Sequence, residues 1–142
     1  MAIQKQEFYE GAALHRLVRG GELATLKSEP PFFLVNDRLL IHLKYCTKTR
    51  TPWGFTFLPE EQRTLAERAE NEEIVIGLVC GGDGVAALPV EEYLLVAPVQ
   101  DLSLRIACRR RHGEHYAVSG PAGELSKKVA PSAWQRLLNG SS

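Results

Sequence analysis

The sequence is poor in cysteine and has no long hydrophobic run. Three cysteines, Cys46, Cys80 and Cys108, stand far apart among the 142 residues. This spacing and their odd number argue against a disulfide framework, so we expect free thiols and a cytoplasmic protein. The longest apolar run, residues 74–80, is far shorter than the about 20 residues that cross a bilayer. The first residues show no secretion signal. We therefore expect no membrane partner.

The chain also lacks a net charge, since 17 basic residues balance 17 acidic ones. Residues 1–58 carry 8 basic and 5 acidic residues, residues 59–101 carry 2 and 10, and residues 102–142 carry 7 and 2. Total charge cannot steer such a protein to nucleic acid, but the first and last segments could form a basic face together. The alternative is a solvated acidic helix in the middle. The length and the 44% apolar content predict a single domain over residues 1–142.

Common catalytic motifs are missing. The glycine-rich residues 81–84 lack the Lys-Ser/Thr of a phosphate-binding loop, so they predict a turn. There is no Gly-x-Ser-x-Gly elbow and no Cys-x-x-Cys pair. Cys108, His112 and His115 have the chemistry of zinc ligands, but no fourth ligand is near them in the sequence. We interpret these histidines as residues of a hairpin turn.

Hydrophobic periodicity predicts an α/β or α+β fold in which helices flank a mixed β-sheet. A helix over residues 6–19 precedes two strands joined at Asn36-Asp37, a dipeptide that tolerates a tight turn. Residues 74–80 are apolar on both faces, which predicts an interior strand. The remaining predicted elements are strands at 32–35, 38–46, 53–57 and 85–88, helices at 59–71, 89–97 and 132–138, and a C-terminal β-hairpin from 102–108 and 115–118.

One group of polar residues carries the candidate chemistry. His42 and Lys44 are two apart on a predicted strand, so both side chains leave the same face. With a two-residue turn at residues 36–37, paired residue numbers sum to 73, which sets Glu29 opposite Lys44. Pro30 and Pro31 weaken that pairing, because proline lacks a backbone donor. Glu10 flanks the apolar stripe of the first helix. The simpler alternatives are a solvent-facing Lys44 and a Glu10 that favours the helix dipole.

These residues and the order of elements resemble the PD-(D/E)XK nuclease superfamily over about residues 7–97. The leading helix around Glu10 matches the first helix of the family, and residues 41–44 stand where its acid-x-Lys strand would be. The resemblance implies a restriction-endonuclease-like core, with Lys44 as the catalytic cation and Glu10 and Glu29 as ligands of Mg²⁺. The departure is His42, which replaces a metal-binding carboxylate and implies an altered or inactive site.

Two basic segments predict contacts with nucleic acid. Lys48 and Arg50 lie among three threonines and precede Trp53, a combination suited to phosphate oxygens and base stacking. Arg109, Arg110 and Arg111 stand before a predicted turn and could add a basic rim to the same face as Lys44. The alternatives are a plain connecting loop and three solvated cations.

Together these features favour a nucleic-acid-binding domain of nuclease-like fold, with DNA or RNA as the partner. A more specific form of this function is a Mg²⁺-dependent endonuclease with an altered or inactive site, in which His42 is a substituted ligand or base. The alternative function is a non-catalytic protein-interaction module, including a homodimeric one, in which Trp53, Phe55 and Trp134 would be contact aromatics. His42 separates the two functions, because an acid there would have favoured the enzyme.

Overall fold

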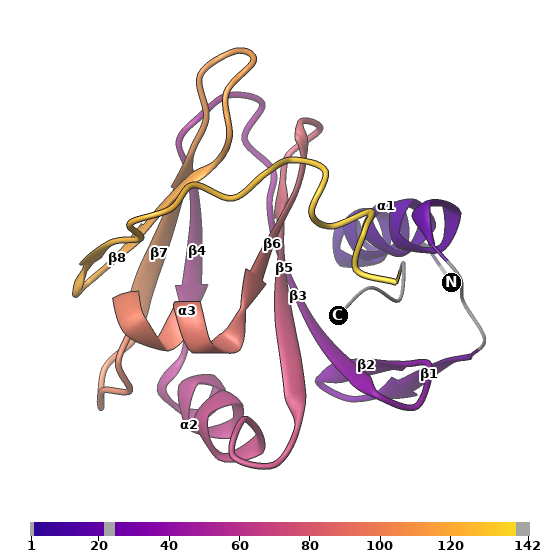
Figure 1. The fold of residues 1–142 in the computed structure, drawn as a ribbon, viewed down its shortest axis with the longest axis horizontal. Coiled ribbons are helices and arrows are strands. Elements are labelled where there is room, and N and C mark those ends of the chain that lie inside the picture. Colours follow the sequence, from indigo (N-terminus) through magenta and orange to yellow (C-terminus); the bar gives the residue numbers. More distant parts are fainter. Residues whose placement is uncertain (1, 22–24, 139–142) are drawn as a thin grey trace.

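A computed structural model describes residues 2–21 and 25–138. This part of the chain forms three helices and two sheets with nine strands, an α+β fold with no closed barrel, as the periodicity predicts (Figure 1). The elements are α1 (Lys5–Gly20), β1 (Leu26–Glu29), β2 (Phe32–Val35), β3 (Leu39–Cys46), β4 (Trp53–Phe57), α2 (Pro59–Arg68), β5 (Glu73–Cys80), β6 (Gly84–Pro89), α3 (Val90–Val96), β7 (Leu104–Arg109), β8 (Ala117–Gly120) and β9 (Gly123–Glu124).

The first sheet is mixed and has the strand order β1-β2-β3-β5-β6. Strands β3 and β5 run parallel along their whole length, from Leu39↔Glu73 to Cys46↔Cys80. Every β5 residue after Glu73 is buried, which confirms the prediction of an interior strand. The chain leaves β3, forms β4 and α2, and returns as β5. This crossover is what brings the start of α2 against one face of β3.

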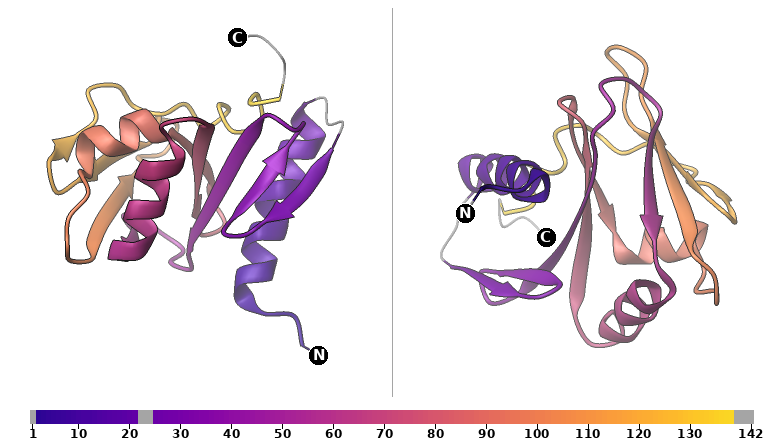
Figure 2. Two further views of the ribbon diagram at one scale, coloured as in Figure 1. Left: turned by 90° about the horizontal axis from the view of Figure 1, so that it is seen from below. Right: turned by 180° about the vertical axis from the view of Figure 1, so that it is seen from behind.

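The second sheet is antiparallel, with the order β4-β7-β8-β9. The predicted C-terminal hairpin is confirmed as β7 and β8. The inner face of β4 and β7 carries Trp53, Phe55 and Phe57 with three residues of β7, all in one hydrophobic core with the first sheet. Figure 2 shows α2 and α3 between the two sheets. The main core therefore lies between the sheets and around these two helices.

A smaller core covers the other face of the first sheet, beneath α1 and the C-terminal segment. Ala13 and Leu17 of α1 pack there with Trp134, which is fully buried and donates its indole N–H to the carbonyl of Ala13 at 2.8 Å. Gly77 makes room for the indole, since a Cβ at this position would lie 2.8 Å from the Trp134 ring. Strand β5 is thus covered by both cores.

The predicted helix at 132–138 is wrong, because this segment is a run of turns. Its backbone N–H groups bond three residues back, as from Arg136 to Ala133 and from Leu137 to Trp134. A seven-residue segment gains little from helical hydrogen bonds, so the burial of Trp134 decides its path.

Helix α2 also ends at Arg68 rather than near Asn71. All three cysteines are free, as predicted. No helix in the described ranges is long and apolar enough to cross a membrane.

The predicted register of the hairpin is wrong by one residue. Strands β2 and β3 pair from Val35↔Leu39 to Phe33↔Ile41, so paired numbers sum to 74. The reason is a loop of three residues, 36–38, in which Asn36 and Asp37 both have positive φ. A second hairpin, which the sequence did not predict, precedes this one. The chain turns back at residues 30–31, and β1 pairs with β2.

Candidate functional site

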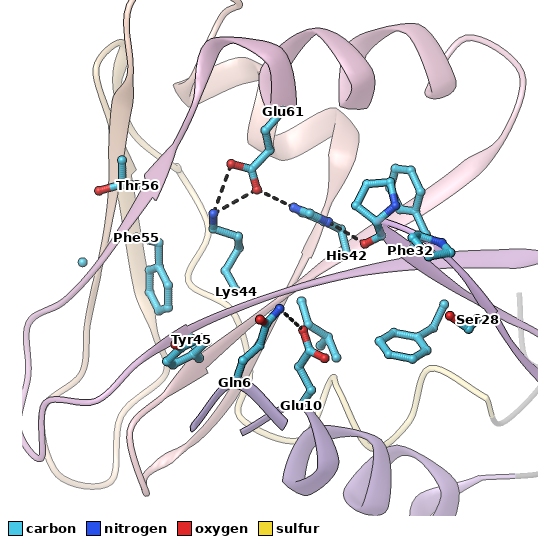
Figure 3. Close-up of a pocket in the computed structure, with 15 residues that line it drawn as sticks. Gln6, Glu10, Ser28, Phe32, His42, Lys44, Tyr45, Phe55, Thr56 and Glu61 are labelled. Carbon is cyan, nitrogen blue, oxygen red and sulfur yellow. Dashed lines mark hydrogen bonds and ion pairs between the residues drawn. The ribbon is translucent and has the colours of Figure 1, made fainter. Parts of the chain in front are cut away.

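A cleft of about 660 Å³ lies between α1, the turn from β1 to β2, β3, β4 and the start of α2 (Figure 3). Its volume is in the range of small-molecule and peptide sites. The lining residues are Gln6, Glu10, Ser28, Pro30, Pro31, Phe32, Phe33, His42, Leu43, Lys44, Tyr45, Gly54, Phe55, Thr56 and Glu61. The cleft therefore contains three of the four predicted catalytic residues.

Strand β3 directs His42 and Lys44 to the same side, toward α2 (Figure 3). Leu40 shares this side and packs in the main core, while Leu39 and Ile41 pack in the smaller core on the opposite side. The predicted alternation of the strand is confirmed. His42 is buried and Lys44 is partly buried, and the Lys44 ammonium lies 4.7 Å from the centre of the Phe57 ring. Both side chains therefore need a partner of opposite charge.

Glu61 is that partner. One oxygen, Oε2, lies 2.6 Å from His42 Nε2 and 2.9 Å from Lys44 Nζ, while Oε1 lies 3.1 Å from the same Nζ. Glu61 occupies the first turn of α2, where its carboxylate also accepts the backbone N–H of Leu58 at 3.1 Å. Proline at the helix start suits this geometry, since Pro59 has no N–H to satisfy. We call His42, Lys44 and Glu61 the Glu61 cluster.

His42 is held in place by contacts at both ring nitrogens. Its Nδ1 lies 3.1 Å from the carbonyl oxygen of Pro31, and its Nε2 faces the Glu61 carboxylate. Both neighbours can accept a hydrogen bond, and the tautomer of the ring decides which nitrogen donates. Lys44 and Glu61 form the ion pair of the Glu61 cluster, and His42 adds a further contact to the same carboxylate.

The pKa of Glu61 is lowered to about 2 from an ordinary value of 4.5. Burial alone would raise the pKa, but the hydrogen bonds and charges of His42 and Lys44 outweigh that effect. Glu61 therefore stays a carboxylate throughout the neutral range. Because it already accepts donors on both oxygens, its main physical role is to join β3 to α2.

The two predicted metal ligands lie apart. Glu29 pairs with Arg68 of α2 at 3.0 Å and does not line the cleft, since it stands opposite Phe32 rather than Lys44. Glu10 lines the cleft from α1 and accepts a hydrogen bond from Gln6 at 2.9 Å. Among the residues that the structure describes, no group of three histidine, cysteine or acidic side chains could hold a metal ion. The cleft thus does not fit a Mg²⁺ site built on Glu10 and Glu29.

The predicted basic residues do not border the cleft, which is a correction. Arg109, Arg110 and Arg111 line a second depression of about 420 Å³ at the ends of β4, β7 and β8. Lys48 and Arg50 lie exposed in the loop before β4. The two loops meet here, because the Arg110 N–H donates to Thr51 Oγ1 at 3.0 Å. The loop before β4 meets the end of β7, where Trp53 pairs with Cys108, whereas the cleft is lined farther along β4 by residues 54–56.

Arg110 differs from its neighbours because its charge is already paired. Its guanidinium binds Asp83 at 2.9 Å, and the Tyr116 hydroxyl donates to the same carboxylate at 2.6 Å. Burial opposes ionisation of Asp83, but these two hydrogen bonds hold its pKa below the usual value. Burial and the bond to Asp83 raise the pKa of Tyr116. This group fastens the β5–β6 turn to the second sheet.

The predicted contact aromatics are all inside the molecule. Trp53 is 3% exposed, Phe55 2% and Trp134 0%. The Trp53 indole N–H donates to the Lys48 carbonyl at 3.0 Å, so it fixes the loop instead of stacking on a base. The cause is the alternation of β4, which turns its aromatic residues inward. Neither stacking by Trp53 nor a protein contact through these three aromatic side chains fits their burial.

Sequence reasoning missed Glu61 and Arg105. Glu61 lies in the predicted helix at 59–71, which was interpreted as a solvated acidic helix, although a lysine on the inner face of a strand requires a counter-charge from a packed element. Arg105 alternates with buried residues of β7 and is exposed on the outer face of the second sheet. The possible zinc ligand Cys108 is buried in the main core, which agrees with the simpler interpretation of the neighbouring histidines.

Comparison with known proteins gives no match. No protein-family model, no curated protein and no solved structure is significantly similar to this chain.

Proposed function

We propose that this chain is a nucleic-acid-binding domain that contacts sugar–phosphate backbones through its second sheet. The supporting observation is a group of exposed cations without a carboxylate partner in the described part of the chain. We call it the basic surface, and its members are Lys48, Arg50, Arg105, Arg109 and Arg111. Unpaired cations lose no ion pair when they bind phosphate, and they release counterions from the nucleic acid.

Strand β7 gives the basic surface its spacing. Arg105 and Arg109 are four residues apart on the outer face, which corresponds to about 13 Å along a strand. Gly54 of β4 lies beside Arg105, and a Cβ there would come 2.0 Å from the guanidinium. The glycine therefore allows the arginine to lie against the sheet. The other outward residues are small, as with Ala107 and Ser119, so a phosphate backbone could approach closely.

The two loops extend the basic surface beyond the sheet. Arg111 follows Arg110, whose backbone is tied to Thr51, and Lys48 and Arg50 belong to the same loop as Thr51. Acidic side chains are also present: Glu114 pairs with Lys128 at 3.6 Å, and Glu124 lies on β9. Five unpaired cations outnumber these acids, so the charge favours a polyanion.

The composition of the basic surface favours binding without base recognition. Trp53 and Phe55 point into the core, so no aromatic side chain of β4 is available to stack on bases. Arginine and lysine contacts to phosphates carry no sequence information. We therefore expect affinity that depends strongly on salt and weakly on sequence.

The proposal includes no metal-dependent cleavage. The resemblance to PD-(D/E)XK nucleases implies carboxylates around Mg²⁺, but Glu29 is held by Arg68 and Glu61 is occupied by His42 and Lys44. These contacts favour the altered or inactive form of such a site. Binding would then be the retained activity.

The test is the anisotropy of labelled single-stranded DNA, duplex DNA and RNA, titrated with protein at 50 and 200 mM salt. Each phosphate contact contributes about −0.7 to −0.9 to the slope of log affinity against log salt. The triple variant Arg105→Gln, Arg109→Gln, Arg111→Gln should reduce the magnitude of this slope by about 2 to 3.

A matched triple variant removes the same charge elsewhere. Lys5, Arg19 and Arg63 are exposed and form no ion pair in the described structure, so Lys5→Gln, Arg19→Gln, Arg63→Gln should bind like wild type. Equal weakening by both triple variants would mean that only net charge matters. Absence of salt-sensitive binding by the wild-type chain would end the proposal.

A further inference from the structure

Half of strand β3 has a neighbour on one side only. Strand β2 pairs with β3 as far as Ile41, whereas β5 pairs with it as far as Cys46. Residues 42–46 therefore form a strand edge on the side where β2 has turned away at residues 30–31. This edge lies in the cleft, whose lining includes His42 through Tyr45. No described strand pairs with it there.

The backbone groups on this edge can be identified. The Cys46 carbonyl accepts the Gly81 N–H at 2.9 Å, on the β5 side. Strand residues direct their N–H and C=O to alternate sides, so His42 and Lys44 also bond toward β5. Leu43 and Tyr45 then direct their N–H and C=O groups into the cleft. Unpaired groups of this kind are a template for a further strand.

One side of the edge presents Lys44 and the other presents Glu10 (Figure 3). On the α2 side lies the Lys44 ammonium, which donates two N–H groups to Glu61. The ammonium has a third N–H. On the α1 side lies Glu10, which accepts from Gln6 and forms no ion pair in the described structure.

We propose that the cleft binds an extended peptide segment that pairs with β3 along Leu43–Tyr45. Successive residues of an added strand face opposite sides, so an acidic side chain toward Lys44 and a basic one toward Glu10 must be neighbours in its sequence. A peptide supplies both N–H and C=O groups at the required spacing, whereas a sugar–phosphate backbone has no N–H for the Leu43 and Tyr45 carbonyls. None of the residues of the basic surface lines the cleft, so the peptide site does not depend on the proposed nucleic-acid function.

The experiment is a selection of random nine-residue peptides displayed on phage against the folded full chain, followed by anisotropy with synthetic copies of the enriched peptides. We expect enrichment of an adjacent acid–base pair within an extended, β-prone sequence. Glu10→Gln and Lys44→Gln should each weaken binding about tenfold, the loss of one charge contact. The triple variant of the basic surface should bind these peptides like wild type.

A matched pair of variants isolates the backbone contact. Tyr45→Pro removes one of the two N–H groups that face the cleft, those of Leu43 and Tyr45, and leaves the bonds to β5, whereas Tyr45→Ala removes the ring and keeps the N–H. Binding should be lost in the first and retained in the second. If Tyr45→Pro does not fold, as judged by circular dichroism, peptides with alternate N-methyl groups replace it, and these should not bind wild type.

Three outcomes would overturn the proposal. The library yields no peptide enriched above background, or the enriched peptides bind Tyr45→Pro and tolerate N-methyl groups at every position. The third is concentration-dependent self-association that Tyr45→Pro abolishes, since the occupant would then be a second copy of this chain. Loss of nucleic-acid binding alone would leave the peptide site standing.

Discussion

The Glu61 cluster and the basic surface show two uses of charge in one small fold. In the cleft, His42 and Lys44 are largely buried and share one carboxylate within 3.1 Å. On the second sheet, Arg105 and Arg109 are exposed and have no carboxylate partner in the described structure. A buried charge must be paired in the folded state, whereas an exposed charge is hydrated by water and remains available to a ligand. Pairing thus marks the charges that hold the fold, although Lys44 keeps one N–H for the proposed peptide.

The largest effect should come from removing the shared carboxylate. Glu61→Ala leaves the Lys44 ammonium without its counter-charge and His42 without an acceptor in a partly buried site, so we expect the free energy of unfolding to fall by about 3–5 kcal/mol. Urea denaturation at pH 7 measures this. Replacing the whole cluster with His42→Leu, Lys44→Met and Glu61→Leu should cost far less, because no unpaired charge remains. Equal destabilisation by both variants would show that packing, and not charge, explains the loss.

The second-largest effect should come from acid, which lowers the free energy of unfolding by protonating Glu61. The pKa of Glu61 is about 2 when folded and 4.5 ordinarily, so its contribution is complete above pH 4.5 and is lost as the pH falls through 2. The shift corresponds to about 3 kcal/mol. Between pH 5 and pH 2, the free energy of unfolding should fall by about 3 kcal/mol more in wild type than in Glu61→Gln. Urea denaturation at each pH measures this difference. Parallel declines would contradict the assignment.

An exposed ion pair provides the intermediate case. Arg38 and Glu73 are 2.8 Å apart, yet their side chains are 54% and 59% exposed. Water screens such a pair, so Glu73→Gln should cost only about 0.2–1 kcal/mol in thermal or urea unfolding. The loss should shrink further at 1 M salt. A cost as large as that of Glu61→Ala would remove the distinction between buried and exposed charge.

The smallest effect on stability is expected on the basic surface. Removing Arg105, Arg109 and Arg111 together breaks no ion pair in the described structure. Each glutamine substitution should therefore change the free energy of unfolding by no more than about 0.5 kcal/mol. Calorimetry can compare this triple variant with wild type. A clear rise in stability would indicate that the arginines repel one another in the free protein.

Strand β5 shows which part of the fold can be predicted from sequence. Its apolar run has only one satisfactory environment, between two layers, and the structure confirms it. The alternation of β3 is equally local, since it assigns His42 and Lys44 to one face whatever the neighbouring strands are. These inferences succeed because they depend on residues within one element.

The partners of the candidate site depend on contacts between elements. Glu29 was assigned to Lys44 by counting across a turn. Because the loop has one more residue and a second hairpin is present, Glu29 instead stands opposite Phe32 and forms an ion pair with Arg68. Glu61 is separated by 19 residues from His42, and no local pattern connects them. Only the return of the chain from β4 into α2 brings the carboxylate to the strand.

Trp134 has a consequence for how the chain folds during synthesis. The smaller core needs its indole, which fills the space above Gly77 and holds the carbonyl of Ala13. When residues 1–120 have left the ribosome, every strand from β1 to β8 is available, but this face of the sheet still lacks its largest side chain. Helix α1, made first, therefore cannot reach its final packing until one of the last described segments has emerged.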